Sequence, residues 1–258
     1  MALLGVDVGG TFTDFYFLDG GRIQVHKRPS TPSSPADAVL AGISENGWRP
    51  SEVVHGSTVA TNTVLERRGP RTAFVATRGF KDLLAIGRQA RPKLYDLEPS
   101  RPRPLVPRDL CFEVDERVAH DGAVLRPLAP DEARRIADSV AAAGAEAAAV
   151  CLLFSFLAPQ HEAALTEALR ARGLDVSASH EVLPEFREYE RASTTTLNAY
   201  VAPAVRGYLK LLEGGLARTG APLLRVLQSS GGAATAAQAA ALPAALLLSG
   251  PAGGVAGA

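Results

Sequence analysis

Acidic, hydroxyl and glycine residues gather near the start of the chain, in the segment DVGGTFTD at residues 7–14. The two glycines allow a tight turn in which no Cβ keeps phosphate oxygens away from the backbone N–H groups. The threonine hydroxyls add donors, and a carboxylate at the strand end suits a hydrated magnesium ion between phosphates. The segment therefore predicts a phosphate-binding hairpin, unlike Walker and Rossmann loops, which lead into helices. We expect Gly9, Gly10, Thr11 and Thr13 to bind the cofactor, Asp7 and Asp14 to be catalytic, and Asp7 to bind the metal.

The alternative for this segment is a plain hairpin whose glycines serve only the turn. That alternative leaves the two aspartates and the two threonines without a purpose, so we favour the phosphate-binding interpretation.

A second candidate site follows a predicted strand end at residues 53–54, where His55 precedes a helix expected over residues 57–68. His55 and Asn62 are predicted to line a substrate pocket as catalytic residues. In the alternative, the segment is structural, because Ser57 is a suitable N-cap for the helix.

The glycine-rich segment SGPAGG at residues 249–254 is a third candidate. We expect residues 246–248 to end a buried strand and residues 255–258 to begin a helix. The turn between them would present free N–H groups to an anion, and the helix dipole would add to the attraction. Alternatively, the glycines only let the helix pack closely on the sheet. The predicted cofactor-binding residues here are Ser249, Gly250, Gly253 and Gly254.

Other polar clusters have simpler interpretations. His161 and Glu162 begin a predicted helix, where a glutamate suits the dipole, and they are interpreted as structural. Residues 187–191 (REYER) predict a charged, solvated helix face, with an arginine near a nucleotide cleft or a partner interface as the alternative. Cys111 and Cys151 have no histidine or second cysteine at ligand spacing, so neither predicts a metal site.

The elements that position these residues follow an α/β pattern. The chain begins with the order β-β-β-α-β-α-β, at residues 3–8, 11–18, 22–28, 35–47, 53–54, 57–68 and 72–77. Residues 89–109 contain five prolines and predict a long extended loop. Helices and buried strands then alternate, and residues 185–218 predict one long helix or two abutting helices, with a kink at Pro203.

Composition narrows the possible partners. Basic and acidic residues both number 27, so the formal net charge is zero and nothing favours nucleic acid or an anionic membrane. No basic region precedes an apolar stretch at the N-terminus, and no apolar run reaches the roughly 18 residues that a membrane span needs. We expect a cytoplasmic protein that binds neither nucleic acid nor membrane.

A set of motifs beyond the hairpin resembles one family. The hairpin at the head of this element order resembles the first domain of the actin/hexokinase nucleotide-binding superfamily, and the remaining motifs resemble the hydantoinase A/5-oxoprolinase family. These motifs are residues 55–62 (HGSTVATN), 77–80 (TRGF), 86–89 (IGRQ), 94–97 (LYDL), 161–162 (HE), 179–182 (SHEV), 187–191 (REYER), 197–201 (LNAYV), 228–232 (QSSGG) and 249–255 (SGPAGGV).

The resemblance implies an ATP- and Mg²⁺-dependent enzyme that opens a cyclic amide, such as 5-oxoproline or an N-substituted hydantoin, through a phosphorylated amide. It also implies a hydantoinase B-type partner subunit and an oligomeric assembly. A ketone carboxylase subunit, a small-molecule kinase and a non-enzymatic nucleotide-dependent assembly module are the alternatives.

The resemblance also implies a domain organisation. We expect an actin-like (ribonuclease H-like) subdomain at residues 1–88, a long loop with an additional α/β segment at residues 89–222, and the start of the following core domain at residues 223–258. Family members carry a second phosphate motif beyond the last of these segments. We therefore expect this chain to be part of a longer protein and to bind ATP poorly by itself.

Overall fold

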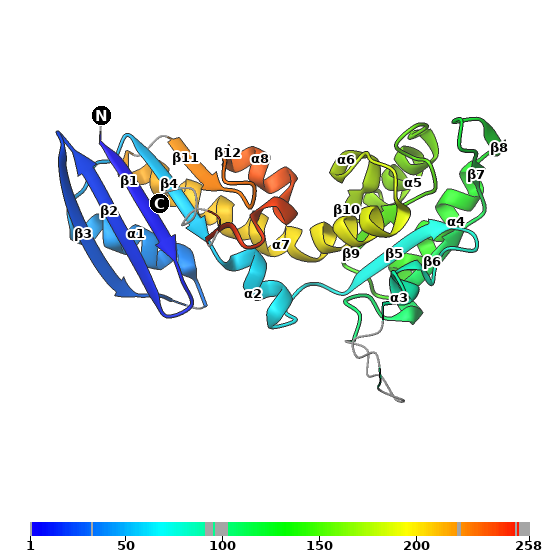
Figure 1. The fold of residues 1–258 in the computed structure, drawn as a ribbon, viewed down its shortest axis with the longest axis horizontal. Coiled ribbons are helices and arrows are strands. Elements are labelled where there is room, and N and C mark those ends of the chain that lie inside the picture. Colours follow the sequence, from blue (N-terminus) through cyan, green and yellow to red (C-terminus); the bar gives the residue numbers. More distant parts are fainter. Residues whose placement is uncertain are drawn as a thin grey trace. The chain divides into compact units, whose positions relative to one another are not determined.

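The computed structural model describes residues 2–31, 33–90, 95, 103–220, 223–250 and 252, and it contains two compact units (Figure 1). The first unit combines Met1–Arg68 with Val201–Ala258, and the second is Gly69–Tyr200. The second unit is therefore an insertion in the sequence of the first. This division differs from the expected boundaries after residues 88 and 222.

The first unit is built on a six-stranded sheet in the order β12-β11-β4-β1-β2-β3. An antiparallel meander of three strands opens the chain, β4 and β11 lie parallel to β1, and β12 is antiparallel to β11. The strands are β1 (Leu3–Val8), β2 (Phe12–Asp19), β3 (Arg22–Pro29), β4 (Glu52–Ser57), β11 (Leu223–Leu227) and β12 (Ala233–Thr235).

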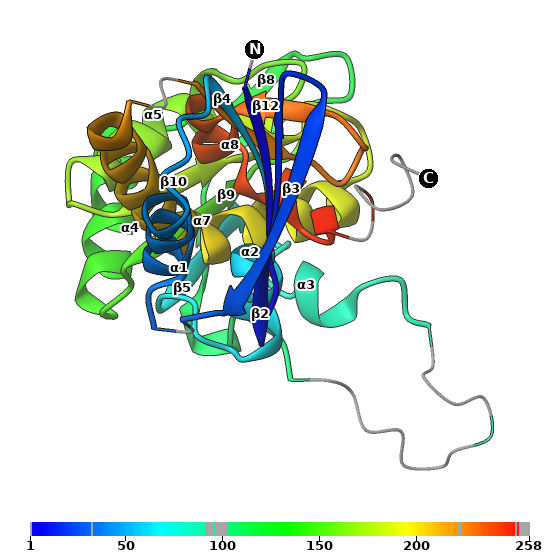
Figure 2. The same ribbon diagram turned by 90° about the vertical axis from the view of Figure 1, so that its left-hand side faces the viewer.

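The residues of the meander alternate between a buried face and an open one. On β2, Phe15 and Phe17 are buried, whereas the neighbouring Tyr16 is 54% exposed. Because side chains alternate across a strand, Asp7 and Asp14 belong to the open face. Helix α1 lies on one side of the meander (Figure 2), and its Gly42 is in contact with the Phe15 ring.

Five helical segments accompany the sheet in the described part of the first unit. They are α1 (Pro35–Glu45), α2 (Val59–Leu65), residues 201–219 of α7 (Glu188–Thr219), α8 (Ala236–Ala241) and the 3₁₀ turn η2 (Pro243–Leu246).

The second unit has a parallel four-stranded sheet in the order β10-β9-β5-β6. Its strands are β5 (Thr72–Thr77), β6 (Cys111–Val114), β9 (Ala147–Cys151) and β10 (Asp175–Ala178), with β7 (Arg117–Val118) and β8 (Val124–Arg126) forming a separate ribbon. Its helices are α3 (Leu83–Ile86), η1 (Arg108–Leu110), α4 (Pro130–Ala142), α5 (Gln160–Arg170), α6 (Ser179–Val182) and residues 188–200 of α7.

Every residue of β5 and β9 is buried, as expected for central strands of a parallel sheet with both faces covered. Ala73 and Val75 pack with residues of α4 and α5, whereas Phe74 and Ala76 pack with Ala192 and other residues on the opposite face. The period of two along β5 thus divides the core of this unit into two layers.

The expected order β-β-β-α-β-α-β is confirmed, but its last strand lies in a different sheet. β5 pairs with β6 and β9. The strand that pairs in parallel with β4 in the first sheet is β11, more than 150 residues later in the chain. A run of β-branched and aromatic residues predicts a strand, but it does not specify the partner with which that strand pairs.

One prediction for the last third of the chain needs correction. Residues 246–248 do not end a strand, because Leu246 is the last residue of the 3₁₀ turn η2, which begins at Pro243. Helix α8 begins at Ala236, after β12, where Thr235 and Gln238 form a capping box. α7 is one continuous helix with Pro203 inside it. Among the residues that the structure describes, no helix is long and apolar enough to span a bilayer.

Candidate active site

The predicted phosphate hairpin is a tight turn between β1 and β2. The Gly9 N–H donates a hydrogen bond to the Phe12 carbonyl at 3.0 Å, which closes the turn. Ser30, just after β3, secures it twice: its N–H donates to the Thr11 carbonyl at 2.9 Å and its hydroxyl donates to the Gly9 carbonyl at 2.8 Å. A Cβ on Gly10 would meet no atom within 4 Å, so the backbone there is open to a ligand.

The two threonines of the hairpin differ in their surroundings. Thr11 is exposed, beside the open glycine turn. Thr13 is fully buried, and its hydroxyl lies 2.9 Å from that of Ser30. The alternation of β2 puts Thr13 on the same face as Phe15, which conflicts with its predicted role as a phosphate donor. Thr13 instead holds the loop after β3 against the hairpin.

Asp7 and Asp14 lie directly opposite each other in the β1–β2 pairing. Partial burial raises the pKa of Asp7, and the negative charge of Asp14 raises it further. Asp14 is paired with Lys27, whose Nζ lies 3.0 Å from its Oδ1. Among the described residues no cation pairs with Asp7, so its carboxylate is the one left free for a positively charged ligand.

Two glycines make room for the Asp7 carboxylate. A Cβ on Gly56, at the end of β4, would lie 3.0 Å from Asp7 Oδ1, and a Cβ on Gly250 would lie 4.0 Å from the same atom. The first and third predicted segments therefore meet at Asp7.

The segment before Gly250 is tied to β4 and α2. The Ser249 hydroxyl is buried and donates to the Ser57 carbonyl at 3.3 Å, and the Leu248 N–H donates to the Thr61 hydroxyl at 3.1 Å. Ser249 is thus committed to the protein backbone. Gly253 and Gly254 lie outside the described residues.

Asn62 lines a pocket of about 430 Å³ together with Gly9 and Gly10. The remaining lining comes from Val8, the loop after β3, residues of the 58–68 segment, α1 and α7, and Asp7 is absent from it. The Asn62 amide donates to the Thr58 hydroxyl at 3.3 Å, which in turn donates to the Val8 carbonyl at 3.1 Å. The structure therefore brings Asn62 to the hairpin, and its catalytic role stays a prediction. Ser57 accepts a hydrogen bond from the Val59 N–H at 3.2 Å, so it supports the helix start, although the N-cap position is Thr58.

His55 lies in the core, and its burial does not favour the predicted catalytic role. The side chain is fully buried; Nδ1 lies 3.3 Å from the Val6 carbonyl and Nε2 lies 2.6 Å from the Tyr208 hydroxyl. A carbonyl only accepts, so Nδ1 carries the proton, and Nε2 accepts from Tyr208. Burial lowers the pKa of His55 to about 4, which keeps the ring neutral.

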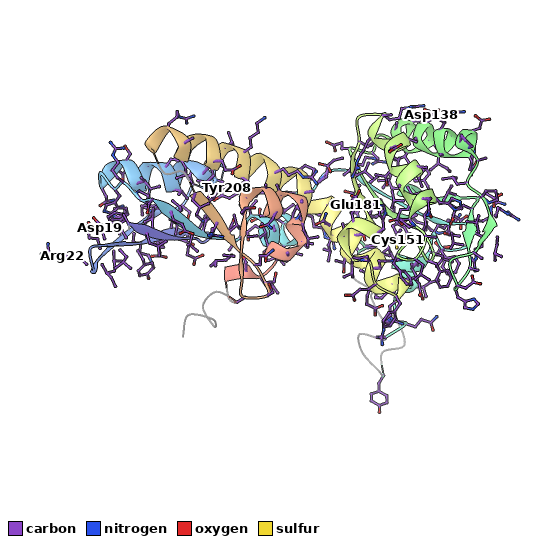
Figure 3. All side chains as sticks on the ribbon, turned by 90° about the horizontal axis from the view of Figure 1, so that it is seen from above. Asp19, Arg22, Asp138, Cys151, Glu181 and Tyr208 are labelled. Atoms are coloured by element: carbon purple, nitrogen blue, oxygen red, sulfur yellow. The ribbon has the colours of Figure 1, made fainter. Side chains whose placement is uncertain are left out.

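Tyr208 (labelled in Figure 3) was not singled out from the sequence. This residue contacts His55 in the core and also lines the pocket. Burial raises the pKa of its hydroxyl. The pair is separated by 153 positions, and no local pattern marks a tyrosine in the middle of a long helix as a partner for a distant histidine. Ser30 was not singled out either, because its partners Thr13 and Gly9 are 17 and 21 positions away in the sequence.

The fold and the hairpin define the class of the protein. Three antiparallel strands followed by two parallel ones, with a glycine turn between the first two, form an α/β domain of the actin/hexokinase-like (ribonuclease H-like) type. The second unit is the additional α/β segment of this fold.

Comparison with known proteins gives the family. The model of the hydantoinase/oxoprolinase N-terminal region matches residues 3–173, and the hydantoinase/oxoprolinase model matches residues 191–258. The chain belongs to the hydantoinase/oxoprolinase family, which confirms the resemblance seen in its motifs.

Individual relatives have described activities. The chain is 34% identical to caprolactamase subunit alpha from Pseudomonas jessenii, over 90% of this chain and 36% of that one. It is 32% identical to 5-oxoprolinase from Saccharomyces cerevisiae, over 98% of this chain and 23% of that one. A nucleotide-free structure of acetone carboxylase matches with a TM-score of 0.87 and 30% identity, covering 98% of this chain and 39% of its own. The chain thus spans well under half the length of these relatives.

Proposed function

We propose that this chain supplies the ATP-binding hairpin of an enzyme that opens cyclic amides at the expense of ATP. The observation that carries the proposal is the position of Asp7, whose carboxylate lies against Gly56 and Gly250 beside an open glycine turn. Family membership supports it, because relatives include a 5-oxoprolinase and a caprolactamase subunit.

The residues around Asp7 fit a nucleotide-bound magnesium ion. Asp7 and Asp14 face each other; partial burial raises the pKa of Asp7 and the charge of Asp14 raises it further, so a cation would relieve both effects. No cluster of three or more metal-ligating side chains occurs in the described part of the chain. Mg²⁺ typically binds one or two carboxylates and otherwise substrate phosphates and water, so the proposal needs only Asp7 as the ligand from the protein.

The hairpin residues would divide the work of holding ATP. Gly9 and Gly10 allow close approach of phosphate oxygens to the backbone, and the exposed Thr11 adds a hydroxyl donor. Asp7 would hold the magnesium ion, which neutralises phosphate charge when bound. The ion pair with Lys27 holds the Asp14 side chain in place. Catalysis of this kind depends mainly on positioning and charge neutralisation.

The proposed reaction solves the problem of a poor leaving group. The amide oxygen bonds to the γ-phosphorus of ATP and ADP leaves. Water adds to the ring carbon, and the ring nitrogen takes a proton and departs, which opens the ring. A second water attacks the acyl carbon and breaks its bond to the phosphorylated oxygen, so inorganic phosphate leaves with the former amide oxygen and a carboxylate remains. We place the cyclic amide in the pocket bounded by Gly10 and Asn62.

The same proposal includes a partner. The caprolactamase relative is a subunit of a larger enzyme, so we propose that the full protein works with a hydantoinase B-type subunit in an oligomer. We place the complex in the cytoplasm, where ATP is available.

A product assay on the full natural protein with its B-type partner tests the proposal. We expect ATP-dependent conversion of a cyclic amide, from a panel of 5-oxoproline, hydantoins and caprolactam, to a ring-opened acid with free phosphate. A stable phosphorylated compound would indicate a kinase instead. A carboxylated ketone would indicate the second candidate, ketone carboxylation, which the match to acetone carboxylase favours.

A further inference from the structure

The second unit contains a basic pocket that the proposed reaction does not use. Its volume is about 540 Å³, and it lies where the loop after β9 meets the first turn of α7. Three arginines and one glutamate supply its charged groups, so its lining carries a net positive charge. The lining residues are Arg88, Leu153, Phe154, Phe156, Phe186, Arg187, Glu188 and Arg191.

Arg191 is the central charged group of this pocket. Arg191 is only 1% exposed, and its Nη2 donates a hydrogen bond to the Leu152 carbonyl at 2.6 Å. The two other guanidinium nitrogens, Nε and Nη1, are buried without a hydrogen-bond partner among the described residues. A buried charge with open donors is strongly unfavourable, so this group calls for an anion.

The carboxylates near Arg191 are already engaged elsewhere. Glu190 is paired with Arg88 through two contacts of 2.8 and 2.5 Å. Glu162 accepts hydrogen bonds from the Leu152 N–H, the Ser179 hydroxyl and both the backbone and the ring of His180. Glu188 is exposed and forms no ion pair with Arg191 in the described structure.

The neighbouring thiol gives no negative charge either. Burial raises the pKa of Cys151 to about 11, so it is neutral at physiological pH (labelled in Figure 3). Within the described residues, no carboxylate therefore forms an ion pair with Arg191, and two of its nitrogens stay without a hydrogen-bond partner.

The rest of the lining is apolar and held in an unusual backbone conformation. Phe154 and Arg187 have φ angles of +56° and +74°, a region that side chains other than glycine seldom adopt. Such strain concentrates at ligand sites. The Phe154 and Phe156 rings lie 6.2 Å apart, and the Arg191 guanidinium lies 5.1 Å from the Phe156 centroid. The N-terminal end of the 32-residue helix α7 adds a favourable dipole for an anion.

We infer that this pocket binds a small organic anion, with its carboxylate or phosphate on Arg191 and its apolar body against the phenylalanine rings. The pocket is built from residues of the second unit, whereas the hairpin belongs to the first, and the inference does not depend on the proposed reaction. It also explains why the REYER motif places an arginine in the interior instead of on a solvated helix face.

Calorimetry on the full protein tests this inference with benzoate and phenyl phosphate as the two anionic probes. We expect saturable binding of at least one probe, and the tighter of the two identifies the head group that the site prefers. Benzamide, a neutral analogue of benzoate, should bind at least tenfold more weakly. Failure of both anions to bind, or equal binding of benzamide and benzoate, would overturn the inference.

Variants separate the pocket from a structural role of Arg191. Arg191→Met should weaken binding of the anion at least tenfold, and its melting temperature without ligand should stay level or rise, because an uncompensated buried charge is removed. Arg187→Gln, at an exposed position, should weaken binding even if Arg191→Met fails to fold. Arg134→Gln on α4, whose partner is Asp131, is the control and should leave binding unchanged. Binding that is unaltered both in Arg187→Gln and in a folded Arg191→Met would contradict the assignment.

Discussion

Among the hairpin residues, Asp7 is the one whose surroundings allow the sharpest test of a functional role. Its carboxylate is opposite Asp14, beside Gly56 and Gly250, and unpaired among the described residues. Asp7→Asn keeps the shape and removes the charge. We expect ATP-dependent turnover of the full enzyme to fall at least a hundredfold, on the order of 3 kcal/mol of lost transition-state stabilisation, while the melting temperature stays within a degree or two or rises.

Asp19→Asn is the matched control for that change. Asp19 is exposed near the turn that joins β2 to β3, where Figure 3 labels it with Arg22. Turnover should be unaltered there. Equal loss of activity in both variants, or a large loss of stability in Asp7→Asn, would argue that Asp7 supports the fold and not the chemistry.

Residue types alone predicted part of this site. The DVGGTFTD segment was recognisable because the turn glycines and flanking acids are contiguous. The roles of Thr13 and His55 were not, because each depends on which side of a strand faces the helices: Thr13 bonds to Ser30, and His55 to Tyr208. A hydroxyl or an imidazole has the same local pattern in a core as in a pocket.

At the scale of elements, α1 and the last turns of α7 pack closely against each other at Gly215. A Cβ on Gly215 would lie 2.2 Å from Leu40 Cδ1, whereas a Cβ on the preceding Gly214 would meet nothing within 4 Å. Gly215→Ala should therefore destabilise the first unit by about 1–3 kcal/mol through overpacking. Gly214→Ala should be neutral or stabilising by up to about 1 kcal/mol, because alanine restricts the unfolded chain.

Urea unfolding followed by fluorescence reads out this pair. Trp48 is the chain's one tryptophan and is buried in the first unit, so its emission reports that unit. A Gly215→Ala protein as stable as wild type would show that Leu40 moves aside at no cost and that the helix contact is not tight.

The type of an element was predictable where one hydrophobic period runs through its sequence. The strand with which it pairs in a sheet was not. Buried runs such as 72–77 were recognisable as strands, and α7 as a long helix. Their sheet membership was not, because β4 pairs with both β1 and the distant β11 while β5 pairs with β9. The insertion of a complete unit between β4 and β11 has no local signal in residues 57–72.

At the scale of the whole molecule, the buried His55–Tyr208 pair makes stability depend on pH. Burial lowers the pKa of His55 from 6.5 to about 4, so the unfolded chain binds more protons between these values. Its contribution to stability is complete above pH 6.5 and declines as the pH falls toward 4. We expect the first unit to lose about 2 kcal/mol between pH 7 and pH 5 from this group.

Two variants test that origin with the same fluorescence assay. His55→Gln should remove most of the loss between pH 7 and pH 5. Tyr208→Phe keeps the buried imidazole, so it should lower stability by about 1–3 kcal/mol at both pH values and retain the pH dependence. If His55→Gln shows the same pH dependence as wild type, another group is responsible.

The most direct test of the proposed function follows one oxygen atom through the reaction of the full enzyme with its B-type partner. The substrate is a cyclic amide labelled with ¹⁸O in its carbonyl group, and the product phosphate is analysed by mass spectrometry. If the amide oxygen attacks the γ-phosphorus, the label appears in inorganic phosphate as the ring opens, and Asp7→Asn abolishes that signal. Ring opening accompanied by unlabelled phosphate would mean that water attacks ATP directly, which contradicts a phosphorylated amide.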